Sequence, residues 1–564
     1  MGGHRTATLL LVAAQCAVLS AWTAPTVLRA GCSGSSCHRP ATAAPSARRG
    51  GAARIVCADS SSSSPRGSPR PESSSPRRAG DAVAVATAPP ALERRQPLST
   101  TPVRLSPWVA LRGIFSCKSF QEFMSFVRRE QGDAVLLDLR PVLPPTYVLM
   151  GKEANRGVLS DHDPSLEQIL QELINLLPVS ARVPSEVDVE LQKKVAALFS
   201  NTAVVNERLP SFTAISQRMR DRWVEQQQQL GAEHAPQPGA DDSGQLDIFL
   251  ELSEYVLKAD MEVLYGRAFT EAHAPQLVSK FGEWVQNIAN GQLVGFFDEL
   301  GELLREAIAE RRNNPAAYSS KGSGENSVLQ VYLDSGALER HDDDAVVGLL
   351  SMTLMAAVFN TQVSLAWILV HLYSDPDLLR RAREEIASCT DLTDYSKLAE
   401  LPFLNSCIDE AVRLHTMLPG NTVLRKTKDE LTLGDETIAK GSVLWLYPNA
   451  VHLDEEYFPQ PQKFCPMRLL SGNLERMSDN FELVTFGHGQ KRCIGEKMAR
   501  AMICSFLGVV LPTIDADSPP DEIPDDGFFD LIPASKLHLY NVRACEASEA
   551  PEAREVAAAR KVAE

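Results

Sequence analysis

A ten-residue stretch, 486–495, carries the residue types best suited to chemistry. It reads Phe-Gly-His-Gly-Gln-Lys-Arg-Cys-Ile-Gly, with one cysteine, Cys493, between glycines and ahead of an apolar run. Glycine allows backbone bends and close approaches that other residues do not. Lys491, Arg492 and the N-terminus of the helix expected next all favour the thiolate form of the cysteine sulfur. The stretch therefore predicts a thiolate held ready for a metal.

The isolation of this cysteine limits which metal it could hold. No second cysteine lies at a CxxC spacing from Cys493, whereas zinc sites and iron–sulfur clusters use several ligands. Haem iron takes one thiolate in one axial position. The residues therefore favour haem, and the competing interpretation is a buried structural cysteine beside a turn.

The same stretch resembles the haem-binding loop of the cytochrome P450 family, Phe-x-x-Gly-x-basic-x-Cys-x-Gly, at every fixed position. The resemblance implies haem b ligated axially by Cys493, with Phe486, Gly487 and Lys491 in cofactor-binding positions. It also implies the cytochrome P450 fold, which is mainly α-helical with small β-sheets. A thiolate ligand supplies an electron push that favours O–O cleavage.

A second motif would fix the core beneath the haem. Glu410 and Arg413 lie three residues apart, so on a helix they share a face and can pair. Segment 464–468 is similar to the family's Pro-x-x-Phe-x-Pro-x-Arg and ends in Arg468. The resemblance implies a structural Glu410–Arg413–Arg468 network. The alternative is a surface ion pair, which contributes about 0–1 kcal/mol.

The expected distal helix departs from the family pattern. Its run 356–361, Ala-Ala-Val-Phe-Asn-Thr, lies where the family has Ala-Gly-x-acid-Thr-Thr, with the register set by Pro376. Asn360 therefore replaces the first threonine, Phe359 replaces the acid, and Thr361 keeps the second threonine. Asn360 and Thr361 are the candidate catalytic residues.

This departure bears on the reaction, because O–O cleavage consumes protons that the acid–alcohol pair would deliver. A phenyl ring cannot deliver them, although an amide can still hydrogen-bond a water. Asparagine beside a non-acid resembles the cholesterol 7α-hydroxylase and prostacyclin synthase branch of the family. Its members hydroxylate sterols or rearrange an oxygenated lipid without O₂ or external electrons. The alternative is that Asn360 is a packed helix residue outside the site.

Three functions are consistent with these motifs. The first is monooxygenation of an apolar substrate, such as a sterol, fatty acid or terpenoid, with O₂ and an external electron donor. The second is electron-independent isomerisation or dehydration of a lipid hydroperoxide or endoperoxide. The third is a non-catalytic haem or lipid carrier, which would have little use for a thiolate's electron push.

Basic residues are expected at the haem propionates and at an electron donor. Lys491 is the first candidate for a propionate and Arg425 a weaker one. The family's Trp-x-x-x-Arg pair is missing from the stretch 187–200, where Lys193 or Lys194 could substitute. Around Cys493 we expect a basic cluster that suits an acidic electron donor, a ferredoxin-type protein or a reductase. Its members are Lys491, Arg492, Lys497 and Arg500.

Charge is distributed unevenly along the chain. The first 104 residues carry 13 arginines and 4 acids, a net charge of +9, so the whole-chain charge of −16 leaves −25 for the remainder. The strong negative charge of the chain after residue 104 argues against nucleic acid or an anionic membrane surface as a partner. Eleven cysteines without paired spacing argue for a reducing compartment and against a disulfide scaffold. We expect a monomer.

The first hundred residues have the features of a targeting sequence. Leu9–Leu19 is an apolar run too short to span a membrane and typical of a signal-peptide core. The Ala-Trp-Thr-Ala-Pro that follows resembles the cleavage site of plastid presequences in algae with secondary plastids. Residues 22–57 are acid-free and arginine-rich, as in a transit peptide. Plastid import is therefore expected, with secretion or endomembrane targeting as the alternative and no transmembrane anchor in the mature chain.

The predicted organisation is a signal peptide (1–21), a transit peptide (22–57), a disordered linker (58–104), one haem domain (105–545) and a disordered tail (546–564). A β-element is expected at 135–150 and strand-like pieces at 430–446. Helical spacing of apolar residues predicts the main helices, at 163–177, 187–200, 208–230, 245–266, 275–312 and 343–373.

Overall fold

The computed structural model describes residues 101–117, 120–138, 140, 144–159, 166–168, 189–233, 245–288, 295–314, 326–336, 342–415, 423–489, 492–517 and 537–545. The predicted signal peptide, transit peptide and tail lie outside these residues and stay predictions. The predicted linker ends too late, because Val103–Arg104 forms strand β1, paired in parallel with β2 (Ala134–Leu137).

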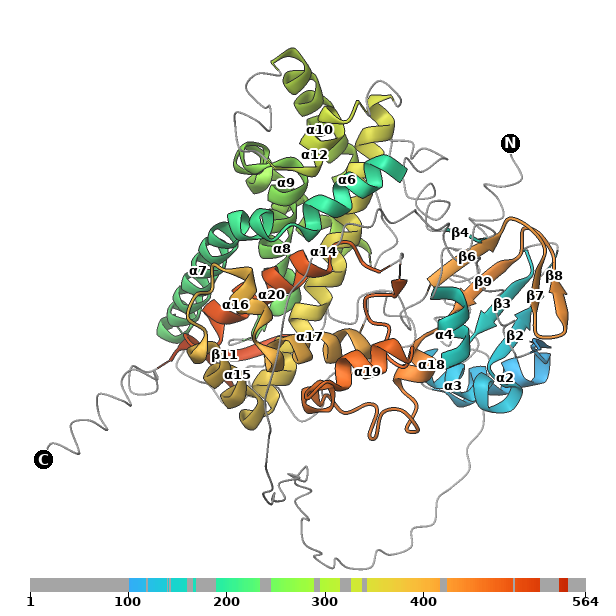
Figure 1. The fold of residues 1–564 in the computed structure, drawn as a ribbon. Helices are drawn as coiled ribbons and strands as arrows, with labels where there is room; N and C mark the ends of the chain where they lie inside the picture. Colours follow the sequence, from blue (N-terminus) through green and yellow to red (C-terminus); the bar gives the residue numbers. More distant parts are fainter. Residues whose placement is uncertain are drawn as a thin grey trace, which may run out of the picture. The chain divides into compact units, whose positions relative to one another are not determined.

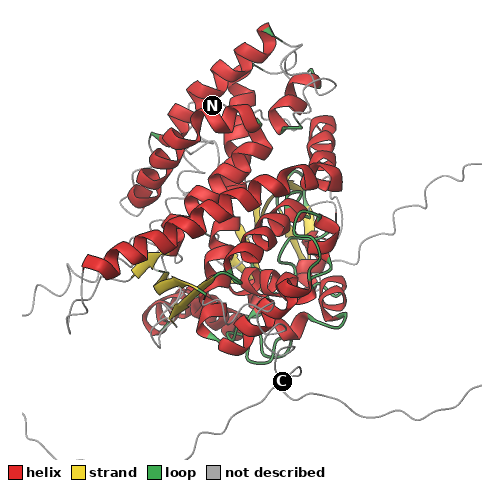
Figure 2. Cartoon of the chain, turned by 90° about the vertical axis from the view of Figure 1, so that its left-hand side faces the viewer, coloured by secondary structure: helices red, strands yellow, loops and turns green. Residues whose placement is uncertain are grey.

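Helices make up most of the described chain (Figures 1 and 2). The longer ones are α2 (Pro107–Ser116), α3 (Phe120–Gln131), α4 (Lys152–Leu159), α6 (Val189–Ser200), α7 (Thr202–Glu233), α8 (Ile248–Tyr265), α9 (Arg267–Ile288), α10 (Phe296–Asn313), α14 (Asp343–Ser374), α15 (Pro376–Ser388), α17 (Pro402–Leu414) and α20 (Glu496–Val510). The shorter ones are α12 (Val328–Asp334), α16 (Tyr395–Ala399), α18 (Asn449–His452), the 3₁₀ helix η2 (Pro466–Leu469) and α19 (Asn473–Asp479).

The strands form three small sheets. The largest has the order β1-β2-β3-β9-β6-β4, from β2 (Ala134–Leu137), β3 (Thr146–Leu149), β9 (Val443–Leu446), β6 (Val423–Thr427) and β4 (Leu166–Gln168). A second sheet has the order β10-β11-β5, from β10 (Ile514–Asp517), β11 (His538–Ala544) and β5 (Gln245–Asp247). A hairpin pairs β7 (Leu431–Leu433) with β8 (Glu436–Ile438). The prediction of a mainly helical fold with small sheets is confirmed.

Helix α14 is the centre of the helical core. It begins at the N-cap Asp342, whose carboxylate accepts a hydrogen bond from the Ala345 N–H, and it ends before Pro376, as helices usually do before proline. It packs against α8, α10, α17 and α20. It is long and apolar enough to cross a membrane, but 67% of its most apolar window is buried inside the protein. That burial is typical of a core helix.

Three predicted helices differ in the structure. In the helix expected at 245–266, residues Gln245–Asp247 form β5 and α8 begins at Ile248. The single helix expected at 275–312 is two, α9 and α10. Gly295 directly precedes α10 and has a φ of 117°. This backbone angle favours glycine and is incompatible with a continuous right-handed helix. Within the helix expected at 163–177, residues 166–168 instead form β4, because they pair with β6.

Candidate haem site

The cysteine loop is bent by its glycines and closed by a backbone hydrogen bond. Gly487 and Gly489 adopt φ of 72° and 59°, in the left-handed region where glycine is not strained. The Cys493 N–H donates to the carbonyl of Phe486 over 2.7 Å. Phe486, Gly487 and Cys493 therefore lie in one closed loop, whereas Lys491 lies outside the described residues.

The loop leaves Cys493 exposed. Burial of the sulfur nevertheless raises the pKa of the Cys493 thiol above its usual value, against the opposing effect of the Gly495 N–H. The charge of Glu496 also raises this pKa, while the Glu496 N–H and the charge of Arg492 lower it. Binding of a metal cation by this sulfur would release its proton.

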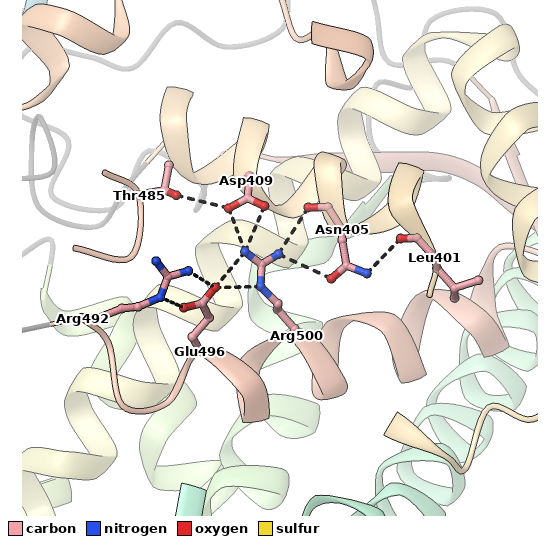
Figure 3. A network of polar contacts seen from close by, with 7 residues as sticks. All are labelled: Leu401, Asn405, Asp409, Thr485, Arg492, Glu496 and Arg500. Carbon is pink, nitrogen blue, oxygen red and sulfur yellow. Dashed lines mark hydrogen bonds and ion pairs between the residues drawn. The ribbon is translucent and has the colours of Figure 1, made fainter. Parts of the chain in front are cut away.

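Sequence reasoning missed a polar network beside this loop (Figure 3). Asp409, buried on α17, accepts from Arg500 Nη2 with both carboxylate oxygens, at 2.9 Å each. Arg500 also contacts Glu496 at 3.0 Å, and Glu496 pairs with Arg492 at 2.6 Å. Thr485 Oγ1 donates to Asp409 over 3.2 Å. The signal in the sequence was weak: one acid before Glu410 and one arginine after the cysteine.

The pKa values show which contacts dominate. Burial raises the pKa of Asp409 above its ordinary value, and the charge of Arg500 only partly opposes this. Burial would also raise the pKa of Glu496, but the hydrogen bond from Arg492 and the charge of Arg500 outweigh it and lower that pKa. Burial would lower the pKa of Arg500, but Asp409 more than offsets it. Arg500 therefore stays charged.

These contacts correct the expected basic cluster. The Arg500 side chain is only 11% exposed and is bound by two acids. Lys497 Nζ donates to the Ser200 carbonyl at 2.7 Å and to Thr202 Oγ1 at 3.1 Å, while Arg492 pairs with Glu496. Arg500 is therefore not displayed as predicted, because it is buried against two acids. The Arg492 side chain stays 48% exposed beside Glu496, and the rest of the cluster remains a prediction.

The structure brings Glu410, Arg413 and Arg468 together. Glu410 and Arg413 are fully buried and joined by two hydrogen bonds of 2.8 Å. Arg468 Nε and the Cys465 N–H both donate to Glu410 Oε1 at 3.0 Å. Buried ion pairs of this kind are tolerated only where further hydrogen bonds satisfy the charges. The network ties α17 to η2.

His452 extends this network to the cysteine loop. Arg413 Nη1 donates to its carbonyl over 2.6 Å, and its Nε2 accepts from the Val484 N–H over 3.1 Å. Burial lowers the pKa of His452 to about 3, and the Arg413 charge adds to the effect. The ring is therefore neutral, as an acceptor at Nε2 requires. Val484 lies two residues before Phe486.

On α14 the candidate catalytic residues differ in exposure. Asn360 is exposed, and its Nδ2 donates to the Ala356 carbonyl over 2.8 Å. Thr361 is buried. Phe359 is buried against Phe281 and Trp284, with ring centroids 5.6 and 5.4 Å away. Among the described residues, no hydrogen bond joins Asn360 to the cysteine loop.

Several features fit a haem. Within the buried middle of α14, Ala356 and Asn360 are the exposed positions, so one strip of this core helix stays open. Arg425 on β6 is partly buried, and burial lowers its pKa. Its described hydrogen bond is to the Leu424 carbonyl, so a propionate could supply the missing negative charge. The buried Nδ1 of His488, also in the loop, has no partner in the described chain.

Comparison with known proteins decides the family. The model of the cytochrome P450 family matches residues 117–532. The chain belongs to the cytochrome P450 family. Its cofactor is therefore haem b, with the iron ligated axially by the Cys493 thiolate.

Relatives of this P450 are known from plants. It is 28% identical over 216 residues to geissoschizine oxidase of Catharanthus roseus, covering 36% of this chain and 42% of the relative. It is 26% identical over 253 residues to 2-hydroxyisoflavanone synthase of Glycine max, covering 42% and 47%. It is 29% identical over 224 residues to a flavonoid 3',5'-hydroxylase of Crocosmia x crocosmiiflora, covering 38% and 41%. The aligned part spans less than half of each relative.

Solved structures share the fold of this P450. One crystal structure of a cytochrome P450 superposes with a TM-score of 0.59 at 17% identity, covering 80% of this chain and all of that one. A retinoic acid-bound cyanobacterial P450 gives the same TM-score and identity, covering 75% and 94%. At such identity the likeness speaks for the fold alone.

Proposed function

We propose that this P450 is a monooxygenase that oxidises an apolar substrate with O₂ and electrons from an external donor. The observation that carries the proposal is the cysteine loop, which keeps every fixed position of the motif and presents Cys493. The names of the relatives, oxidase and hydroxylase among them, support the same reaction class.

Residues on both sides of the haem would have defined tasks. Bound haem supplies the iron that activates O₂, and the Cys493 thiolate supplies the electron push. Asn360 uses Nδ2 to bond Ala356, which leaves its Oδ1 free to accept a hydrogen bond and orient a water. Arg425 would bind a propionate. Phe359 excludes water from its side of α14 through its aromatic neighbours.

The substrate class proposed is a sterol, fatty acid or terpenoid. The open strip of α14 offers the methyl group of Ala356 and the amide of Asn360, with no ionisable side chain at either position. Apolar pockets with few polar groups select apolar ligands. A single amide would suit a substrate with one hydroxyl or carbonyl group.

Phe359 favours a second candidate function, the electron-independent rearrangement of a lipid hydroperoxide or endoperoxide. An acid at this position would feed protons to the distal side, but here a buried phenyl ring packs between aromatic rings of α9. A rearrangement of this kind needs neither O₂ nor reductant. This is the chemistry of the prostacyclin synthase branch that the asparagine resembles.

The electron donor proposed for the monooxygenase is an acidic, ferredoxin-type protein. Arg492, Lys497 and Arg500 are engaged within the chain. The exposed Lys193 and Lys194 lie on α6, which packs against α20, the helix that follows the cysteine loop. We propose that α6 supplies the basic contact.

Turnover under two conditions separates the candidates. Purified full-length protein would be given a fatty-acid hydroperoxide without reductant, and separately a panel of sterols, fatty acids and terpenoids with O₂, ferredoxin and its reductase. We expect product only in the second arm, with an oxygen atom from O₂ in the product. Rapid hydroperoxide consumption without reductant would overturn the monooxygenase proposal in favour of rearrangement.

A further inference from the structure

We propose that Arg500 is a positioning residue for the iron–thiolate bond. It acts through the loop brace, the four residues Asp409, Arg492, Glu496 and Arg500 (Figure 3). The proposal rests on the haem-thiolate cofactor and not on which reaction the haem performs.

The loop brace is anchored on α17. Asp409 is 1% exposed and receives Arg500 Nη2 on both oxygens at 2.9 Å. Arg500 Nη1 reaches the carbonyl and the Oδ1 of Asn405, one turn earlier on α17, at 3.4 and 3.5 Å. One guanidinium thus contacts two turns of the helix that also carries Glu410 and Arg413.

Asp409 and Arg500 also contact the part of the cysteine loop that precedes Cys493. Thr485 donates to Asp409 over 3.2 Å. The Arg500 guanidinium carbon lies 4.7 Å from the centroid of the Phe486 ring, within the range of a cation–π contact. Because Phe486 accepts the hydrogen bond that closes the loop, Arg500 acts on the residue that fixes the Cys493 backbone.

Glu496 connects the part of the chain that follows Cys493 to Arg500. It accepts from Arg500 Nη2 at 3.0 Å and from Nε at 3.1 Å. It also pairs with Arg492 through two hydrogen bonds of 2.6 and 2.9 Å. Arg492 directly precedes Cys493 and Glu496 follows it by three residues, so their pairing connects the chain on both sides of the cysteine to Arg500.

The loop brace is balanced in charge, with two carboxylates and two guanidiniums. It can therefore hold the loop without placing a net charge beside the sulfur. A lysine at position 500 would keep the charge, but its single ammonium group cannot reproduce the planar fork that serves Asp409, Glu496 and Asn405 together. A glutamine would leave Asp409 buried without a cation, which is costly.

The test uses full-length Arg500→Lys and Arg500→Gln. The readouts are the rate of haem transfer to apomyoglobin and the fraction of the ferrous–CO complex with the thiolate-shifted band. We expect Arg500→Gln to lose haem about 10–100-fold faster, the usual effect of losing a partner behind a metal ligand, and to lose much of that band. Arg500→Lys should fall between it and wild type.

Arg383→Gln is the matched control. Arg383 is also partly buried and donates to the Leu511 carbonyl over 2.7 Å, at the far end of α20 from Cys493. We expect this variant to keep the wild-type band and haem-transfer rate. Equal haem loss in Arg383→Gln and Arg500→Gln would overturn the proposal, since it would indicate general destabilisation.

If Arg500→Gln does not fold, Arg500→Lys alone tests the positioning role of Arg500. Wild-type behaviour of Arg500→Lys in both readouts would overturn the proposal. Neither readout involves turnover, so failure of the proposed monooxygenase function would leave this test unaffected.

Discussion

Asp260 on α8 is a buried carboxyl that forms no ion pair with any described residue. It is 5% exposed, and its Oδ2 has no hydrogen-bond partner in the described chain. Burial raises the pKa of Asp260 well above its ordinary value of 3.8. The folded protein therefore keeps the proton at a pH where the unfolded chain has released it.

This residue should make stability fall as pH rises. Above pH 3.8, Asp260 costs the folded state about 1.4 kcal/mol for each pH unit until its folded pKa is reached. In Asp260→Asn the side chain at position 260 cannot ionise, so unfolding no longer releases a proton from it. We therefore expect this variant to gain stability over wild type as pH increases from 4 to 7 and to gain little near pH 4, measured by urea unfolding.

Asp377→Asn provides the comparison, since the Asp377 side chain is 93% exposed. It should leave the pH profile of stability unchanged. A pH-independent difference between Asp260→Asn and wild type would contradict the interpretation of Asp260 as a buried, protonated carboxyl.

Helix α17 holds two ion pairs that face different parts of the chain. Its Glu410–Arg413 pair binds η2 through Arg468, while its Asp409 binds α20 through Arg500. Adjacent residues on one helix thus connect the segments before and after the cysteine. This explains why α17 is buried at nearly every position.

Removing Arg413 should be far more costly than removing an exposed arginine. Arg413→Ala leaves Glu410 buried without its close partner, and breaking a buried pair costs about 3–5 kcal/mol. Arg380 pairs with Glu384 on the exposed face of α15, where such a pair contributes about 0.3–0.5 kcal/mol. Thermal unfolding of both variants checks this; comparable losses would contradict it.

Elements were predictable where the deciding contacts are local. The Glu410–Arg413 pairing follows from three-residue spacing on one helix, and α14 follows from its apolar run and its proline boundary. The Asp409–Arg500 pair joins residues 91 positions apart, which no local pattern indicates. Strand β4 likewise exists because it pairs with β6, so its helical spacing was misleading.

At the scale of the whole molecule, net charge was a poor guide to local charge. Although the total charge is acidic, the cations near Cys493 in the sequence suggested a local basic docking surface. The fold instead places Asp409 and Glu496 against those arginines. This tertiary pairing, which sequence counts do not contain, is the basis of the positioning role proposed for Arg500.

The central claim is that Cys493 is the thiolate ligand of the haem. The most direct measurement is the ferrous–CO difference spectrum of full-length wild type, Cys493→Ala and Cys389→Ala, the last a partly exposed free cysteine on another segment. We expect the thiolate-shifted band in wild type and Cys389→Ala and its loss in Cys493→Ala. Wild type without that band, or Cys493→Ala with it, would contradict the claim.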